Sequence, residues 1–270
     1  MMKLPFKLKK FIPKILTKLA LICVYTIITI FIAVKSKIPT VNNIKISSSN
    51  PESKKSTLIY IPPVEDAPQK GRIHTSERPD CPESDQVLTA IVPRWNLALT
   101  ISESPTFWFY IPYASNAIES VAIVLWDGEQ NKIDQISVSV ESTPGIINIK
   151  LPQTTLNIDQ KYRVDFALTC KASDSNSKGG KLTVTTFLKR IDLEDDLAHR
   201  LKLATTPRQK YTLYAANGIW YEALTELAEL KKSQNNDPQV NQDWQAFLSQ
   251  SEIDLPELIS EKIVDCCTSQ

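Results

Sequence analysis

The chain has 270 residues, of which 42% are hydrophobic and 23% charged, and its formal net charge is +1 at pH 7. This length is enough for one large domain or two small ones, and the hydrophobic fraction is ordinary for a globular protein. The first 51 residues hold nine lysines and no acid, whereas the remainder holds all 30 acids against 22 lysines and arginines. The remainder is therefore acidic, which argues against a basic nucleic-acid-binding face and predicts no nucleic-acid partner.

The amino-terminal residues 1–36 have the pattern of an export signal or membrane anchor. Six lysines from Lys3 to Lys18 precede an uncharged apolar run, Leu19–Val34. A charged segment followed by an apolar one is typical of a signal peptide, and lysines before the run favour a cytoplasmic amino terminus. We expect a protein anchored in the membrane through Leu19–Val34 and facing the periplasm, or a periplasmic or extracellular protein after cleavage. The sequence leaves both open.

Residues 37–84 are predicted to be a linker. Seven prolines lie between Pro39 and Pro82, and the polar run Ser47–Asn50 lies among them. A segment of this composition buries too little apolar surface to offset the entropy lost on ordering. We therefore expect a semi-extended tether between the membrane and a folded domain.

Residues 85–190 have the pattern of short strands separated by turns. Turn residues such as Asp127-Gly128 and Pro144-Gly145 divide the apolar and alternating segments. These segments are Val87–Val92, Thr106–Ile111, Ser120–Trp126, Ile133–Val140, Ile146–Leu151, Tyr162–Thr169 and Leu182–Leu188. About seven short strands with regular turns predict an immunoglobulin-like β-sandwich.

The segment Thr106–Ile111 is the clearest of these strands. Five aromatic residues occur within the seven positions that follow Thr106. Because side chains alternate along a strand, Trp108 and Tyr110 point to one face, and Phe107 and Phe109 to the other. Both faces are apolar, so we expect a central strand that is covered on both sides.

Residues 191–265 are predicted to be helical and to pack on the sandwich. Pro207 is placed to begin a helix that Gly218 ends, and Ile219–Lys232 carries an amphipathic stripe. One repeat-like helix pair cannot form the groove of a tetratricopeptide array, which needs several repeats. We therefore expect a helical hairpin that covers the second face of a sheet.

The cysteines point to disulfides. Cys23 lies in the apolar run, which leaves Cys81, Cys170, Cys266 and Cys267, an even number in an exported chain. Three pairings are possible and the sequence does not choose among them. We prefer Cys81 with Cys170; alternatively, the last two cysteines each reach a separate partner, and a direct bond between them ranks lower because it closes a small ring. Metal-ligand spacings are missing, so no metal is expected.

Several blocks together resemble a known family. The blocks are Ala90–Pro93, Ser102–Tyr113, Pro144–Ile146, Tyr162–Cys170, Gly218–Leu224 and Cys266-Cys267. Over about residues 78–268 the chain resembles the cyanobacterial "domain of unknown function 928" family. Members often carry a Gly/Arg-rich stretch before the first cysteine, of which only Gly71-Arg72 and Arg78 remain here. The resemblance implies an exported protein and no activity, cofactor or catalytic residue.

The chain has no recognisable catalytic motif. It contains no nucleophile elbow, P-loop or H-E-x-x-H sequence. Its two histidines, His74 and His199, fall in the predicted linker and in a charged helix. Ser102 and Ser104 have no base near them in sequence, and the paired acids that begin at Asp127 lie in a predicted turn. We therefore expect no enzyme and no cofactor.

We expect a non-catalytic accessory protein of the cell envelope that binds another envelope protein. The candidate interaction surface is Trp220, Tyr221 and Trp244, because Trp and Tyr dominate binding hot spots. One alternative is a module that binds wall glycan or exopolysaccharide through two or three coplanar exposed aromatics. A hydrolase is the less favoured alternative.

Overall fold

The computed structural model describes residues 58–64, 72, 81–94, 97–151, 155–172 and 179–269. All of them belong to one of the two units of the chain, Lys55–Gln270. The predicted Leu19–Val34 segment lies outside the described residues. Among the residues that are described, none of the helices has the length and apolar character needed to cross a membrane.

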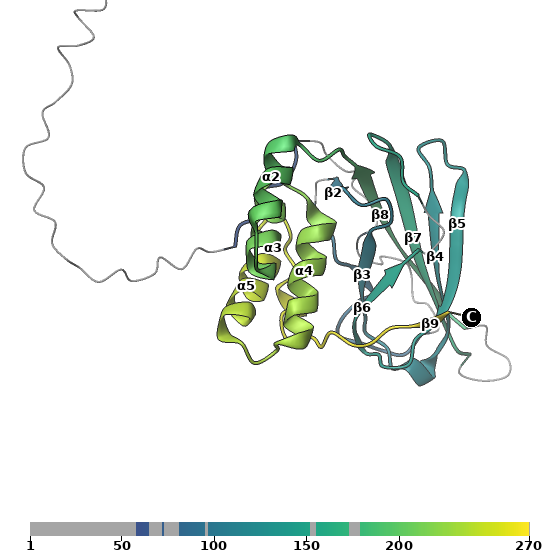
Figure 1. The fold of residues 1–270 in the computed structure, drawn as a ribbon. Helices are drawn as coiled ribbons and strands as arrows, with labels where there is room; N and C mark the ends of the chain where they lie inside the picture. Colours follow the sequence, from purple (N-terminus) through teal and green to yellow (C-terminus); the bar gives the residue numbers. More distant parts are fainter. Residues whose placement is uncertain are drawn as a thin grey trace, which may run out of the picture. The chain divides into compact units, whose positions relative to one another are not determined.

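Two β-sheets form the centre of this unit (Figure 1). The smaller sheet has the antiparallel order β1-β3-β6, with β1 at Thr89–Ala90, β3 at Thr106–Ile111 and β6 at Gly145–Lys150. The larger sheet has the order β2-β8-β7-β4-β5-β9, and only its β2–β8 pair is parallel within the described residues. Its strands are β2 (Ala98–Thr100), β4 (Ile118–Trp126), β5 (Lys132–Ser139), β7 (Lys161–Cys170), β8 (Lys181–Arg190) and β9 (Thr268–Ser269).

The prediction of a mainly β region is confirmed for the longer strands. Strand β3 has the predicted bounds, and β4 to β8 each overlap a predicted segment. Strand β1 is shorter than the predicted Val87–Val92. Strands β2 and β9 were not predicted, because two or three residues are too short to show an alternating pattern.

Four α-helices follow β8 within the described part of the chain, and β9 comes after them. They are α2 (Asp195–Leu203), α3 (Pro207–Ala216), α4 (Trp220–Ser233) and α5 (Pro238–Leu248), accompanied by the short 3₁₀ helices η1 (Ser115–Ala117) and η2 (Pro256–Leu258). Pro207 begins α3 as predicted, behind the capping box of Thr206 and Gln209. Gly218 ends it in the left-handed region at φ 71°.

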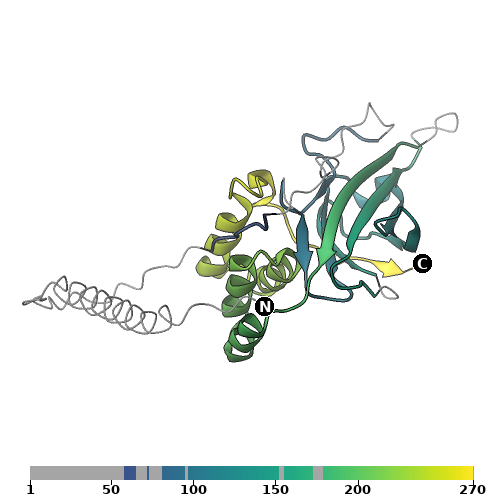
Figure 2. The same ribbon diagram turned by 90° about the horizontal axis from the view of Figure 1, so that it is seen from above.

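The small sheet lies between the helices and the large sheet (Figures 1 and 2). Phe109 of β3 stacks on Phe166 of β7, with ring centroids 4.0 Å apart. On the other face, the indole N–H of Trp108 donates to Thr225 Oγ1 of α4 at 3.0 Å. No side chain from Phe107 to Ile111 is more than 4% exposed, so the prediction of a central strand covered on both sides is confirmed.

One part of the predicted linker is packed in the structure. Leu58 and Tyr60 are each 2% exposed, and the Tyr60 ring meets Trp220 and Phe247 edge-on at 5.0 and 6.2 Å. The Tyr60 backbone N–H also donates to Gln250 Oε1 at 2.7 Å. These contacts correct the prediction of an open tether for residues 58–64, since two apolar side chains at alternate positions suffice to fix this proline-rich segment on the helices.

Candidate functional site

The three aromatics predicted to form an interaction surface are buried. Trp220 is 0% exposed and Tyr221 and Trp244 are 1% exposed. The indole N–H of Trp220 donates to the carbonyl of Ile91 at 3.0 Å, and Tyr221 meets Phe107 edge-on at 5.4 Å. The three residues therefore do not form an exposed surface. They lie on the inward stripe of α4 and α5, and sequence alone does not separate large aromatics that bind a partner from those that fill a core.

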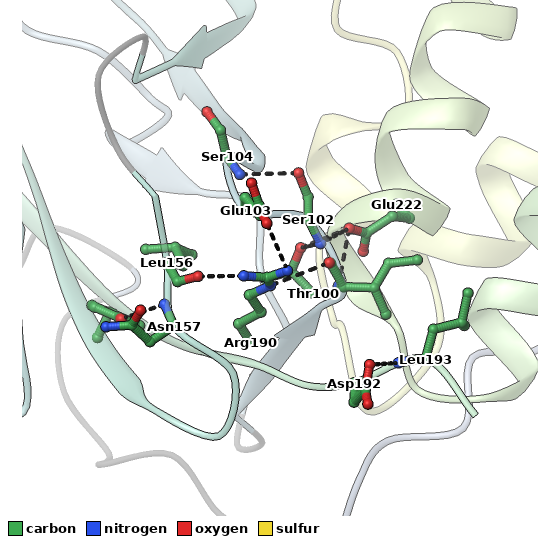
Figure 3. A network of polar contacts seen from close by, with 12 residues as sticks. Thr100, Ser102, Glu103, Ser104, Leu156, Asn157, Arg190, Asp192, Leu193 and Glu222 are labelled. Atoms are coloured by element: carbon green, nitrogen blue, oxygen red, sulfur yellow. Dashed lines mark hydrogen bonds and ion pairs between the residues drawn. The ribbon is translucent and has the colours of Figure 1, made fainter. Parts of the chain in front are cut away.

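An extended polar network surrounds Glu222, in the first turn of α4 (Figure 3). Its Oε1 accepts hydrogen bonds from the Thr100 hydroxyl at 2.6 Å and from the backbone N–H groups of Ile101 and Ser102 at 3.1 and 3.0 Å. Its Oε2 is buried without a hydrogen-bond partner. Burial raises the pKa of Glu222, and the hydrogen bonds from Thr100, Ser102 and Ile101 only partly offset this effect.

Arg190, at the end of β8, holds the same stretch of chain from the other side (Figure 3). Its guanidinium donates to the carbonyls of Leu156 at 2.5 Å and Ile101 at 3.4 Å, and to Glu103 Oε1 at 3.2 Å. The chain between β2 and β3 is thus fixed between a carboxylate of the helical layer and a guanidinium of the large sheet.

The serines near Glu103 take part in this framework. Ser102 Oγ accepts from the backbone N–H of Ser104 at 3.1 Å. The Ser104 hydroxyl donates to the carbonyl of Leu151 at 2.8 Å. These bonds give both hydroxyl groups a structural role in shaping the turn that leads into β3.

A small polar cleft of about 160 Å³ opens beside this network. Glu222 and Glu226 lie one helical turn apart on its α4 wall, and burial, together with the charges of these two residues, raises the pKa of Tyr214. Its lining residues are Ser102, Ser104, Pro105, Thr106, Lys150, Tyr214, Tyr221, Glu222, Thr225 and Glu226. Carboxyl and hydroxyl groups in this arrangement can hold ordered water or a small polar group by hydrogen bonds.

Other candidate groups lie apart from this cleft. Asp127 accepts hydrogen bonds from the backbone N–H groups of Glu129 and Asn131 at 2.9 and 2.8 Å, as expected for a turn. His199 is exposed on α2, and His74 lies outside the described residues. Within the described ranges, no group of three or more His, Cys, Asp or Glu side chains is arranged to hold a metal ion.

The preferred disulfide is confirmed. Cys81 and Cys170 are bonded, with their Cα atoms 5.4 Å apart, and they are separated by 89 positions in sequence. Cys266 and Cys267 are bonded to each other. This corrects the alternative in which each reaches a separate partner: once Cys81 and Cys170 have paired, no other cysteine of the described chain remains for them.

The family described as Domain of Unknown Function (DUF928) matches residues 72–263. The chain belongs to the DUF928 family. The matched span agrees with the expected range of about 78–268, and it contains the Cys81–Cys170 bond and the Glu222 network. No curated protein and no solved structure matches the chain.

Two of the residue blocks that carry the resemblance to DUF928 contact each other in the structure. The block around Trp108 contacts α4, and the block that contains Trp220 and Glu222 forms the first turn of that helix. Sequence reasoning singled out this block but assigned no role to Glu222 or Arg190. Their partners lie 120 and 87 positions away in sequence, so only the fold reveals these contacts.

Proposed function

We propose that this protein is an exported accessory protein of the cell envelope that binds another protein and carries out no catalysis. Residues 1–36 serve as its signal peptide or membrane anchor. The observation that carries the export proposal is the Cys81–Cys170 disulfide. Such bonds persist in oxidising compartments and are rare in reducing ones.

Residues from the sequence blocks that resemble the DUF928 family are buried in the core, and this supports a binding role. Trp108, Trp220 and Tyr221 are buried, and the Ser104 hydroxyl and Glu222 Oε1 are hydrogen-bonded to the surrounding framework. Residues that are buried or hydrogen-bonded in this way stabilise the fold, so we place the interaction on the exposed surface of the protein.

Glycan binding is a second candidate function, favoured by the outer face of the large sheet. Trp126 of β4 lies opposite Arg163 of β7, which lies opposite Phe187 of β8. All three side chains are half-buried, and the guanidinium carbon of Arg163 lies 4.6 Å from the Trp126 ring centroid. Asp165 accepts from the Thr185 hydroxyl at 2.8 Å in the adjacent row. Aromatic and hydrogen-bonding side chains on one face of a sheet suit a sugar chain.

We further propose that the two sheets form an immunoglobulin-like sandwich. If β1, β3 and β6 are taken as strands A, B and E, the strands β8, β7, β4 and β5 correspond to G, F, C and C′, which is the order of that fold. A second feature supports this description. Tyr162, at the start of β7, accepts a hydrogen bond at 2.8 Å from the backbone N–H of Asn157, five residues upstream, as in a tyrosine corner.

Protease access to the carboxy-terminal domain tests the export proposal. We expect protease added to spheroplasts to digest the domain of the full chain, and the Cys81–Cys170 bond to form without added oxidant. A domain that is protected until lysis, with both cysteines open to maleimide, contradicts export.

Crosslinking and glycan-affinity electrophoresis distinguish the two binding candidates. A protein crosslinked to the wild-type chain in native membranes supports the first. Retardation by wall polysaccharide that is lost in Trp126→Ala, and kept in the matched outer-face variant Val124→Ala, supports the second.

A further inference from the structure

An open groove of about 610 Å³ lies between the end of α2 and helix α3. The apolar residues Leu203, Ala204 and Leu213 line it, and two arginines, Arg200 and Arg208, stand beside them. Its volume falls within the usual range for binding sites. It is larger than the 160 Å³ cleft beside Glu222, and no motif of the sequence pointed to it.

Leu203 is the unexplained apolar residue of this groove. It is 65% exposed at the carboxyl end of α2, and the buried part of that helix consists of Leu197 alone. A single exposed leucine is common on a protein surface. Here, however, the leucine adjoins two further half-buried apolar residues, Ala204 and Leu213, in a concave site. An apolar side chain of a partner could therefore pack against all three residues in one concave site.

The charge around the groove is opposite to that of the rest of the unit. Helices α2 and α3 carry four bases, Arg200, Lys202, Arg208 and Lys210, against two acids, Asp195 and Asp196, although the chain after residue 51 has more acids than bases. A groove with basic residues at its rim in an acidic domain favours an acidic partner.

Two acids, one on α2 itself and one on α5, pair with these arginines. Asp196 of α2 lies 3.7 Å from Arg200, but the two side chains are 82% and 47% exposed. An ion pair this exposed is weak and easily exchanged. Asp243 of α5 is buried and pairs at 2.7 Å with Arg208, whose side chain is 37% exposed, so that guanidinium is already held by a buried carboxylate. Arg200 is therefore the better placed of the two to bind an incoming carboxylate.

We propose that this groove binds an acidic amphipathic helix of a partner protein. The inference rests on the proposed protein-interaction function and adds the surface and the partner's chemistry. Leucine-type side chains of the partner helix pack on Leu203 and Leu213, as in other helix-in-groove complexes. Its carboxylates pair with Arg200, whose planar guanidinium suits bidentate contacts.

Two synthetic helices test the proposal with the full chain in detergent. Both are 16 residues long and have the same leucine positions, and one has glutamate and the other lysine on the polar face. We expect the acidic helix to bind, Leu203→Glu to weaken that binding at least tenfold, and Arg200→Glu to weaken it while improving binding of the basic helix. The matched control is Ile133→Glu on β5, because Ile133 is also an exposed apolar residue, at 46% exposure. It is expected to change nothing.

Equal binding of both helices, no binding of either, or equal loss in the Ile133→Glu control overturns the proposal. So does tight binding of phosphatidylglycerol vesicles that Leu203→Glu abolishes while neither helix binds, because the groove then accepts a lipid surface. Thermal melting of each variant reports whether the fold is kept. A crosslinked envelope partner that is retained by Leu203→Glu would overturn this groove as the site and leave the proposed function standing.

Discussion

At the residue scale, Glu222 shows how one side chain joins two layers of the fold. A single carboxylate oxygen accepts three hydrogen bonds from the chain that leaves β2. Buried donors that lose their acceptor carry a desolvation cost, which makes removal of the carboxylate more harmful than the net value of each bond suggests.

We predict that Glu222→Ala lowers the free energy of unfolding by about 2–4 kcal/mol, because three donors lose a partly charged acceptor at once. Glu222→Gln keeps an acceptor oxygen and should lose less. Urea denaturation measures both, and Glu226→Gln, one turn further along α4, is the matched control. Equal stability of the alanine variant and the wild type would show that the network adds nothing to the fold.

The raised pKa of Glu222 gives a second prediction, in the pH dependence of stability. Its folded pKa lies above the ordinary value of 4.5, so the folded state favours the protonated form. The stability contributed by this protonation is therefore present below pH 4.5 and is lost as the pH rises through the folded pKa. We expect the stability of the wild type relative to Glu222→Gln to decrease over that range in urea titrations at several pH values. A difference that is constant with pH contradicts the shift.

At the element scale, Asp243 connects α5 to α3. It accepts from Arg208 Nε at 2.7 Å, from the Tyr211 hydroxyl at 2.6 Å and from Gln239 Nε2 at 3.0 Å. Burial alone would raise the pKa of Asp243, but the hydrogen bonds from Arg208 and Tyr211 hold it below its usual range. The contact between the two helices thus depends on one ionised carboxylate.

We predict that Asp243→Asn destabilises the protein by about 1.5–3 kcal/mol near pH 7, because the hydrogen bonds that the buried carboxylate accepts from Arg208, Tyr211 and Gln239 lose their charged acceptor. The folded pKa is depressed, so the stability contributed by Asp243 is present above its ordinary value of 3.8 and is lost as the pH falls through the folded pKa. Chemical denaturation at several pH values checks both effects. Asp237→Asn, at the cap of the same helix, is the control, and it should cost less than Asp243→Asn.

The packed segment 58–64 is also an element-scale feature. The carbonyl of Ile61 lies 2.9 Å from the position that a Cβ would take at Gly218, and the Ile61 backbone N–H donates to the carbonyl of Ala215 at 3.0 Å. A glycine that permits both a positive φ and this close approach links the end of α3 to the incoming chain.

We predict that Tyr60→Ala releases this segment and costs about 3–5 kcal/mol, because a buried aromatic side chain leaves a cavity against Trp220 and Phe247. Limited proteolysis should then cleave the chain near residue 60. Ile59→Ala, which changes an exposed neighbour, should leave the cleavage pattern unchanged. Cleavage of both variants at the same rate would show that the segment is not held by Tyr60.

At the scale of the whole molecule, the sequence predicted elements better than contacts. Strand β3 and helix α3 could be placed because alternation, Pro207 and Gly218 are local signals. The packing of Tyr60 against the helices could not be predicted, since its proline-rich surroundings are typical of a linker. Nor could the burial of Trp244 or the pairing of Glu222 with Thr100, because these depend on how α4 and α5 meet the small sheet. The groove at Leu203 could not be predicted either, because it depends on which apolar side chains of α2 remain exposed in the fold.

The Cys81–Cys170 bond also acts at the scale of the whole molecule, because it joins the chain before β1 to the end of β7. The two cysteines are separated by 89 positions in sequence, and for a loop of this length the chain-entropy model gives a stabilisation of about 4–5 kcal/mol. We predict that the double change of Cys81 and Cys170 to alanine lowers the free energy of unfolding by this order, measured in urea under oxidising conditions. The same double change at Cys266 and Cys267 is the matched control. Adjacent residues enclose no loop, so their bond restricts the unfolded chain very little and its removal should cost much less. A larger loss at the adjacent pair would mean that the carboxy-terminal tail, and not the long loop, limits the stability of the fold.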